Sequence, residues 1–171
     1  GMVQFKNVFT GIENKTLEDV ERVYHTKVKG LQTLLKVIDE SKLTHLILFS
    51  SAAGFFGNAG QSDYAAANEV LNQYAIQFSQ NHPECQIVSF NWGPWEGGMV
   101  DEDLKKMFEE RGVCVIPVET GTSLFTECVL NPPDEPLLIV GSTMGVPEGD
   151  IPISNESKEI SRVLKSEKLP V

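Results

Sequence analysis

The chain has 171 residues and a net charge of −10, and 41% of its residues are hydrophobic and 22% charged. This length and composition are typical of one globular domain with its own core. This acidity argues against nucleic-acid binding, which needs a concentrated positive surface, and no apolar run approaches the ~20 residues of a membrane span. No secretory signal is visible and the three cysteines are scattered, so the sequence favours a cytoplasmic protein with reduced thiols and no metal site.

The predicted elements alternate between helix and strand, without an internal repeat. Thr16 and Asp19 have the spacing of a capping box at the start of the first helix, and Ser62 or Asp63 is expected to cap the second. In chain order we predict a helix over 16–40, a strand over 46–50, a glycine loop, a helix over 62–81, a strand over 86–92, helices over 101–111 and 119–130, and a strand over 137–140.

This order predicts an α/β domain with about three parallel strands, right-handed crossovers and flanking helices. We assign the domain to residues 1–145. Residues 146–171 begin with prolines and continue as a polar stretch, so we expect a linker or tail there, with a short helix near 156–165 at most.

Four residues stand out by their positions. Lys27 falls in the apolar stripe of the first helix, where a lysine must snorkel to water or have a partner. Tyr64 and Asn68 make the first turn of the second helix polar while its later turns are apolar, which indicates a cleft at that end. Ser51, with Ser50 before it, follows the first strand, at the edge where open α/β sheets bind ligands. The stripe on the first helix comprises Val20, Tyr24, Leu31, Leu34 and Ile38.

Each of these residues also has an ordinary structural interpretation, and the pattern alone leaves it open. A lysine in such a stripe commonly snorkels, a tyrosine can pack by its ring, an asparagine can serve the backbone, and a serine after a strand is often a cap or turn residue.

The intervals between the four residues carry a resemblance. Ser51 follows Lys27 by 24 residues, Tyr64 follows Ser51 by 13, and Asn68 follows Tyr64 by 4. Together with the patterns TKVKG, FSSAAG and YAAAN, they resemble the catalytic tetrad of the ketoreductase domains of polyketide and polyunsaturated fatty acid synthases, which are relatives of short-chain dehydrogenases/reductases. The resemblance covers residues 7–145, and the run NWGPWEGGMV is similar to the family segment that packs beside the nicotinamide and leads into a lid.

This resemblance implies a partial Rossmann-like fold, the catalytic half of a doubly wound parallel sheet. It implies NADPH-dependent reduction of a β-ketoacyl group that an acyl carrier protein delivers within the rest of a synthase. Tyr64 would be the proton donor, Ser51 a hydrogen-bond donor to the carbonyl, and Lys27 the cation that lowers the phenol pKa. Asn68 would hold the network or a relay water.

The family segments also imply which residues contact the nicotinamide end of the cofactor, namely Tyr64, Asn68, Pro94 and Trp95. For Trp95, and for Trp92 before it, a place in the core is the alternative.

The sequence departs from the family in two respects. It has no Gly-rich nucleotide fingerprint, because Gly54, Gly57 and Gly60 follow the serine in a different loop. The leucine-aspartate-aspartate motif of one stereochemical class is absent near 8–9, and Phe56 stands where the other class has tryptophan, so product stereochemistry is not assigned.

We therefore expect the isolated chain neither to bind NADPH tightly nor to reduce a ketone. The unpaired edge of the 46–50 strand favours a homodimer. Two other hypotheses stay open: a non-enzymatic remnant or scaffold that kept the tetrad, and a two-part enzyme completed by a separate cofactor-binding chain.

Overall fold

The computed structural model describes residues 10–97, 100, 105, 106, 108, 110 and 112–141. Three parallel strands form one sheet in the order β1 (His45–Ser51), β2 (Gln86–Trp92), β3 (Leu137–Val140). The predicted α/β class with three parallel strands is therefore confirmed. The predicted bounds of β2 and β3 match the structure, and β1 is longer than predicted by one residue at each end.

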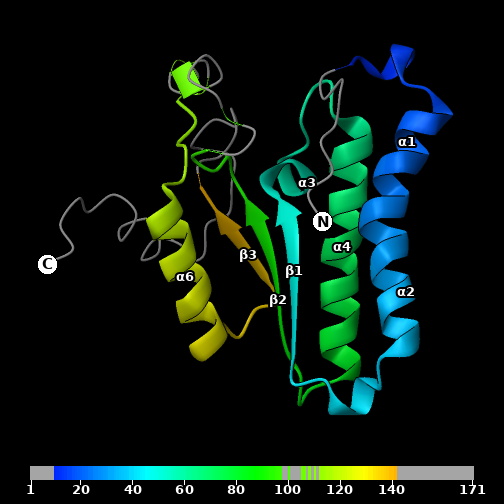
Figure 1. Ribbon diagram of the computed structural model, residues 1–171, viewed down its shortest axis with the longest axis vertical. Helices are drawn as coiled ribbons and strands as arrows, with labels where there is room; N and C mark the ends of the chain where they lie inside the picture. Colours follow the sequence, from blue (N-terminus) through cyan, green and yellow to red (C-terminus); the bar gives the residue numbers. More distant parts are fainter. Residues whose placement is uncertain are drawn as a thin grey trace, which may run out of the picture.

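Helices cover both faces of the sheet (Figure 1). The helices α1 (Leu17–Tyr24), α2 (Gly30–Val37) and α4 (Ser62–Asn81) lie on one side, and α6 (Val118–Leu130) lies on the other. Alternate strand residues face the two layers, as the pleat requires. The first core comprises Leu31, Leu48, Leu71, Ala75, Phe78, Cys85 and Ile87, and the second comprises Val88, Phe90, Trp92, Ile116, Cys128, Leu138 and Val140.

The first predicted helix begins as expected but is not a regular α-helix. The Thr16 hydroxyl accepts a hydrogen bond from the Asp19 backbone N–H at 3.2 Å, and the Asp19 carboxylate accepts one from the Thr16 N–H, which confirms the capping box. Between α1 and α2 the chain forms one π-helical turn, His25–Lys29. The helix ends at Val37, three residues before the predicted end.

The π-turn corrects the predicted apolar stripe. The structure buries Val23, Val28 and Leu31 in this helix, whereas Val20 and Leu34 stay substantially exposed, as does Ile38 after the helix. A π-turn holds one more residue than an α-turn, so it rotates every later side chain around the helix axis. A single 3.6-residue period therefore could not place both halves of the helix correctly.

A short helix, α3 (Ala52–Phe56), replaces the first part of the predicted glycine loop, so Gly54 lies in a helix. Gly57 ends it with a φ of +74°, a conformation that favours glycine. The prediction that Ser62 or Asp63 caps α4 was wrong, because the cap position is Gln61 and its side chain makes no capping bond. Two 3₁₀ segments complete the described elements, η1 (Ile12–Asn14) and η3 (Glu40–Lys42).

Some predicted elements lie outside the described residues. Of the predicted helix over 101–111, four residues are described and are helical, at positions 105, 106, 108 and 110. The predicted linker over 146–171, with its helix near 156–165, lies entirely outside. Within the described part, every helix is too short or too polar to cross a membrane.

Candidate active site

Lys27 is held between β1 and α4. It lies in the π-turn, its Nζ donates a hydrogen bond to the carbonyl oxygen of Phe49 at 3.0 Å, and the same Nζ lies 5.3 Å from the centre of the Tyr64 ring. Such a position over a ring face is a cation–π contact. Burial lowers the pKa of the Lys27 ammonium to about 8. Lys27 therefore has partners inside the protein and does not merely snorkel to water.

Asn68 connects Tyr64 with the end of β1. Its Nδ2 donates to the Tyr64 carbonyl oxygen at 2.8 Å, and its own carbonyl oxygen accepts from the Ser50 hydroxyl at 3.1 Å. The residue is completely buried, yet its Oδ1 accepts no hydrogen bond from the described residues. Asn68 thus serves the backbone, as the ordinary interpretation has it, and still offers one unsatisfied buried acceptor beside Tyr64.

Ser51 is the last residue of β1 and the N-cap of α3. Its Oγ accepts a hydrogen bond from the Ala53 N–H at 3.2 Å, and in the sheet it is the register partner of Trp92. A hydroxyl that accepts one hydrogen bond still carries a proton to donate. The structure therefore joins Lys27, Tyr64 and Asn68 through direct contacts, and places Ser51 next to the strand residues that Lys27 and Asn68 touch.

Pro94 and Trp95 contact residues on the side of the sheet that α6 covers. The carbonyl oxygen of Pro94 accepts from the Ile116 N–H at 2.7 Å. The Trp95 ring meets Trp92 edge-on, with ring centres 4.7 Å apart, and lies so close to Gly121 that a Cβ there would be 2.4 Å from it. Trp92 is thus a core residue and Trp95 is partly buried against the same core, while the cofactor contacts of Pro94 and Trp95 stay predictions.

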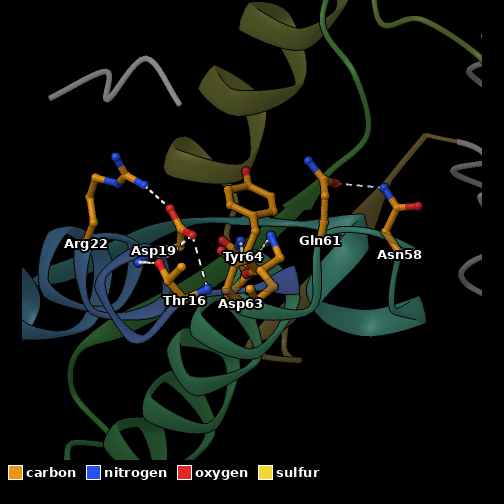
Figure 2. A network of polar contacts seen from close by, with 9 residues as sticks. Thr16, Asp19, Arg22, Asn58, Gln61, Asp63 and Tyr64 are labelled. Atoms are coloured by element: carbon orange, nitrogen blue, oxygen red, sulfur yellow. Dashed lines mark hydrogen bonds and ion pairs between the residues drawn. The ribbon is translucent and has the colours of Figure 1, made fainter. Parts of the chain in front are cut away.

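A buried ion pair at the start of α4 was not predicted. The Nζ of Lys15 lies 2.7 Å from Oδ1 of Asp63, and each side chain is only 6% exposed. Asp63 directly precedes Tyr64, and Figure 2 shows these two residues side by side. The partners are far apart in sequence, and no local pattern connects them.

A buried polar network behind the site was not predicted either. Asn72 donates to Asn91 Oδ1 at 2.8 Å and accepts from the Ser89 hydroxyl at 2.9 Å, and all three side chains are completely buried. It fixes α4 to β2 one turn beyond Asn68. The available signal was the pair Ser89 and Asn91, two polar residues on one face of a strand whose other face is apolar.

The described residues contain no group of three or more His, Cys, Asp and Glu side chains that could hold a metal. Burial raises the pKa of the Cys85 and Cys128 thiols, with Glu84 and Glu127 as lesser causes. Both thiols are therefore core groups and poor nucleophiles.

Comparison with known proteins places these features in a family context. A family model described as the KR domain matches residues 7–97, just over half of the chain. One of the polyunsaturated fatty acid synthase subunits of Thraustochytrium sp. is 45% identical over 128 residues, which are 75% of this chain and 4% of that protein. Polyketide synthase PksN of Bacillus subtilis is 34% identical over 142 residues, which are 78% of this chain and 3% of that protein.

Solved structures agree with this similarity. A ketoreductase domain from the bacillaene assembly line has a TM-score of 0.67 and 33% identity, over 78% of this chain and 33% of that one. A 3-ketoacyl-(acyl-carrier-protein) reductase from Brucella melitensis, complexed with NADH, has a TM-score of 0.66 at 10% identity over 80% of this chain and 62% of that one, and shares the fold. The chain spans a few per cent of the curated relatives and about a third of the solved ketoreductase domain.

Proposed function

This chain belongs to the KR domain family, and from that premise we propose that it supplies the catalytic half of an NADPH-dependent β-ketoacyl reductase in a polyketide or polyunsaturated fatty acid synthase. Its substrate would be a β-ketoacyl chain on an acyl carrier protein, and its partners the rest of the synthase. The observation that carries the proposal is the position of the Lys27 ammonium over the Tyr64 ring, beside the end of a parallel strand.

The residues divide the chemistry as follows. When bound, NADPH supplies a hydride to the carbonyl carbon, and negative charge develops on the carbonyl oxygen. Ser51 donates a hydrogen bond to that oxygen, and Tyr64 transfers its phenolic proton to it, which completes the hydroxyl. The Lys27 ammonium stabilises the charge left on the phenol oxygen. The buried Oδ1 of Asn68 can accept from a water that returns a proton to the site.

The described residues fit only the nicotinamide end of the cofactor. Asn68 offers an unsatisfied acceptor next to Tyr64. The sequence has no glycine-rich turn for a pyrophosphate, which supplies much of the affinity in this kind of fold. We therefore propose that the 171-residue chain needs a cofactor-binding half, in the same polypeptide or another, for activity.

A second candidate function is a self-associating scaffold module, and one observation favours it. Among the described residues β1 has a strand neighbour on one side only, and Phe49 on this edge strand is 52% exposed. The Phe49 carbonyl on this edge accepts from Lys27, and the rest of the edge has no strand partner among the described residues. A strand edge with an exposed aromatic residue invites pairing with another chain. We propose a twofold homodimer through β1, which covers the open edges of both copies.

The test of the enzymatic proposal is Tyr64→Phe in a reductase that contains this chain together with a cofactor-binding half. We expect most of the ketone reduction to be lost while NADPH affinity is kept, because the phenol supplies the proton and not the cofactor site. Tyr74→Phe is the matched control on the same helix; Tyr74 accepts a hydrogen bond from Gln32, outside the site. Wild-type turnover in Tyr64→Phe would rule out this residue as the proton donor.

A further inference from the structure

Residues 10–16, which we call the strap, are fixed at two points, one in the loop before α4 and one in the first turn of α4. The Thr10 N–H donates to the carbonyl oxygen of Gly60 at 2.9 Å, two residues before α4 begins. Five residues later, the Lys15 ammonium lies 2.7 Å from the Asp63 carboxylate in the first turn of α4. The strap then leads directly into the Thr16 cap of α1.

The ion pair differs in kind from an ordinary surface pair. Lys42 and Asp39 are 3.1 Å apart with side chains 81% and 54% exposed, and such pairs contribute little to stability. The side chains of Lys15 and Asp63 are almost fully covered, so removing one partner leaves an uncompensated charge away from water. The Asp63 carboxylate also lies at the positive end of the α4 dipole, in a helix whose cap position, Gln61, supplies no side-chain bond.

We propose that the strap is a positioning element for Tyr64, and that the buried Lys15–Asp63 ion pair attaches the strap to α4. The first turn is the least secured part of a helix, because its backbone N–H groups have no partners within the helix. Tyr64 lies in this turn, immediately after Asp63, and its ring has to remain at the Lys27 ammonium. The strap also leads into the cap of α1, which continues into the π-turn that contains Lys27. It is therefore connected to both segments that form the Lys27–Tyr64 contact.

This role rests on the proposed function of Tyr64 but can be tested without any reaction. The chain has three tyrosines, Tyr24, Tyr64 and Tyr74, so incorporation of 3-fluorotyrosine gives three ¹⁹F resonances, of which Tyr64→Phe identifies one. Tyr74 is the internal reference, because it lies on the same helix ten residues further on. If the Lys15–Asp63 pair merely stabilises the whole fold, a variant that lacks the pair and remains folded will show the Tyr64 resonance unchanged.

The deciding variant is the double substitution Lys15→Met with Asp63→Asn, which removes the pair without leaving a buried charge. We expect its Tyr64 resonance to shift and broaden while that of Tyr74 stays in place. The single variant Lys15→Arg, which keeps the charge, should retain most of the wild-type Tyr64 signal. Lys42→Met, which breaks the exposed pair, should leave the Tyr64 resonance unchanged.

A folded double variant with the wild-type Tyr64 position and line width would overturn the positioning role. The readout needs neither NADPH nor substrate. A Tyr64→Phe variant that retains turnover would therefore remove the enzymatic proposal and leave the strap's effect on Tyr64 measurable.

Discussion

Gly54 and Asn68 touch almost backbone to backbone: a Cβ on Gly54 would lie 2.8 Å from the Asn68 Cβ and 3.0 Å from the Glu69 nitrogen. Gly54 belongs to α3, which starts directly after Ser51, and Asn68 belongs to α4, one turn after Tyr64. The missing side chain allows the two helices to approach closely at the height of the candidate site. The distance between the serine and tyrosine segments therefore depends on this contact.

Gly54→Ala should accordingly destabilise the chain by about 1–3 kcal/mol, because the added methyl group meets backbone that has no room to give. The free energy of unfolding in urea, followed by circular dichroism, measures the effect. Gly30→Ala is the matched control, since the nearest atom to its Cβ is 3.8 Å away and its backbone is helical. That substitution should stabilise the chain by about 0.4–1 kcal/mol. Equal stabilities of the two variants would contradict the close contact.

Lys27 predicts a pH dependence of stability. Burial lowers its pKa from 10.5 to about 8 in the folded chain, so between these values the unfolded chain binds more protons than the folded one. The contribution of Lys27 to stability therefore rises with pH through this window. We expect the urea midpoint of the wild type to increase relative to that of Lys27→Met between pH 8 and 10.5. Lys29→Met, at an exposed position, should keep the wild-type slope, and parallel curves for wild type and Lys27→Met would count against the buried ammonium.

The buried network on β2 predicts a large cost for Asn72→Leu. The substitution leaves the Asn91 Oδ1 without its donor and the Ser89 hydroxyl without its acceptor, and each orphaned group costs about 1–3 kcal/mol. Gln73→Met is the control on the next, exposed position of α4 and should change the unfolding free energy by less than about 0.5 kcal/mol. A similar small change for both variants would show that the network relaxes to find other partners.

The open edge of β1 predicts self-association. We expect multi-angle light scattering to give the mass of a dimer for the wild type and of a monomer for Phe49→Lys, because a charge on an edge strand opposes pairing. Val37→Lys is the control, since Val37 is also exposed but lies on α2, across the sheet from the Phe49 ring and its α6 partner Phe125. A monomeric wild type at micromolar concentration would remove the homodimer proposal.

The isolated chain should bind NADPH weakly at most. Without a pyrophosphate cradle the cofactor is not held at reacting distance, and such positioning can account for ~7–11 kcal/mol of a barrier. Isothermal titration calorimetry should therefore show no binding at micromolar concentrations. A measured micromolar affinity would mean that oligomers of this chain assemble a cofactor site.

Local signals explain which elements were predictable. The β3 strand is a continuous apolar run between Pro136 and Gly141, and β2 is rich in β-branched and aromatic residues and ends before Gly93-Pro94. Pro83 marks the end of α4, so these bounds needed no tertiary information. The π-turn was not predictable in this way, because nothing in the apolar pattern marks where the extra residue is inserted; the turn carries Lys27, which contacts the Phe49 carbonyl of a distant segment. Leu34, which follows the π-turn, was placed in one apolar stripe with residues before the turn for this reason.

In the candidate site, too, some contacts were indicated by the sequence and others were not. The intervals between Lys27, Tyr64 and Asn68 indicated residues that the structure joins by direct contacts. The Lys15–Asp63 pair joins segments that are distant in sequence, where a charged residue ordinarily indicates a solvated surface. Only the fold decides which charges are buried together.

Both tryptophans of the chain lie in one cluster on the α6 side of the sheet, where Trp92 stacks on Phe90 and meets Trp95 edge-on. Indole emission is consequently a local reporter. It follows the packing of α6 against β2 and does not sense the layer formed by α1, α2 and α4. If that layer melts first, circular dichroism will lose all of its helical signal except that of α6 while the fluorescence stays native, and the two melting curves will separate.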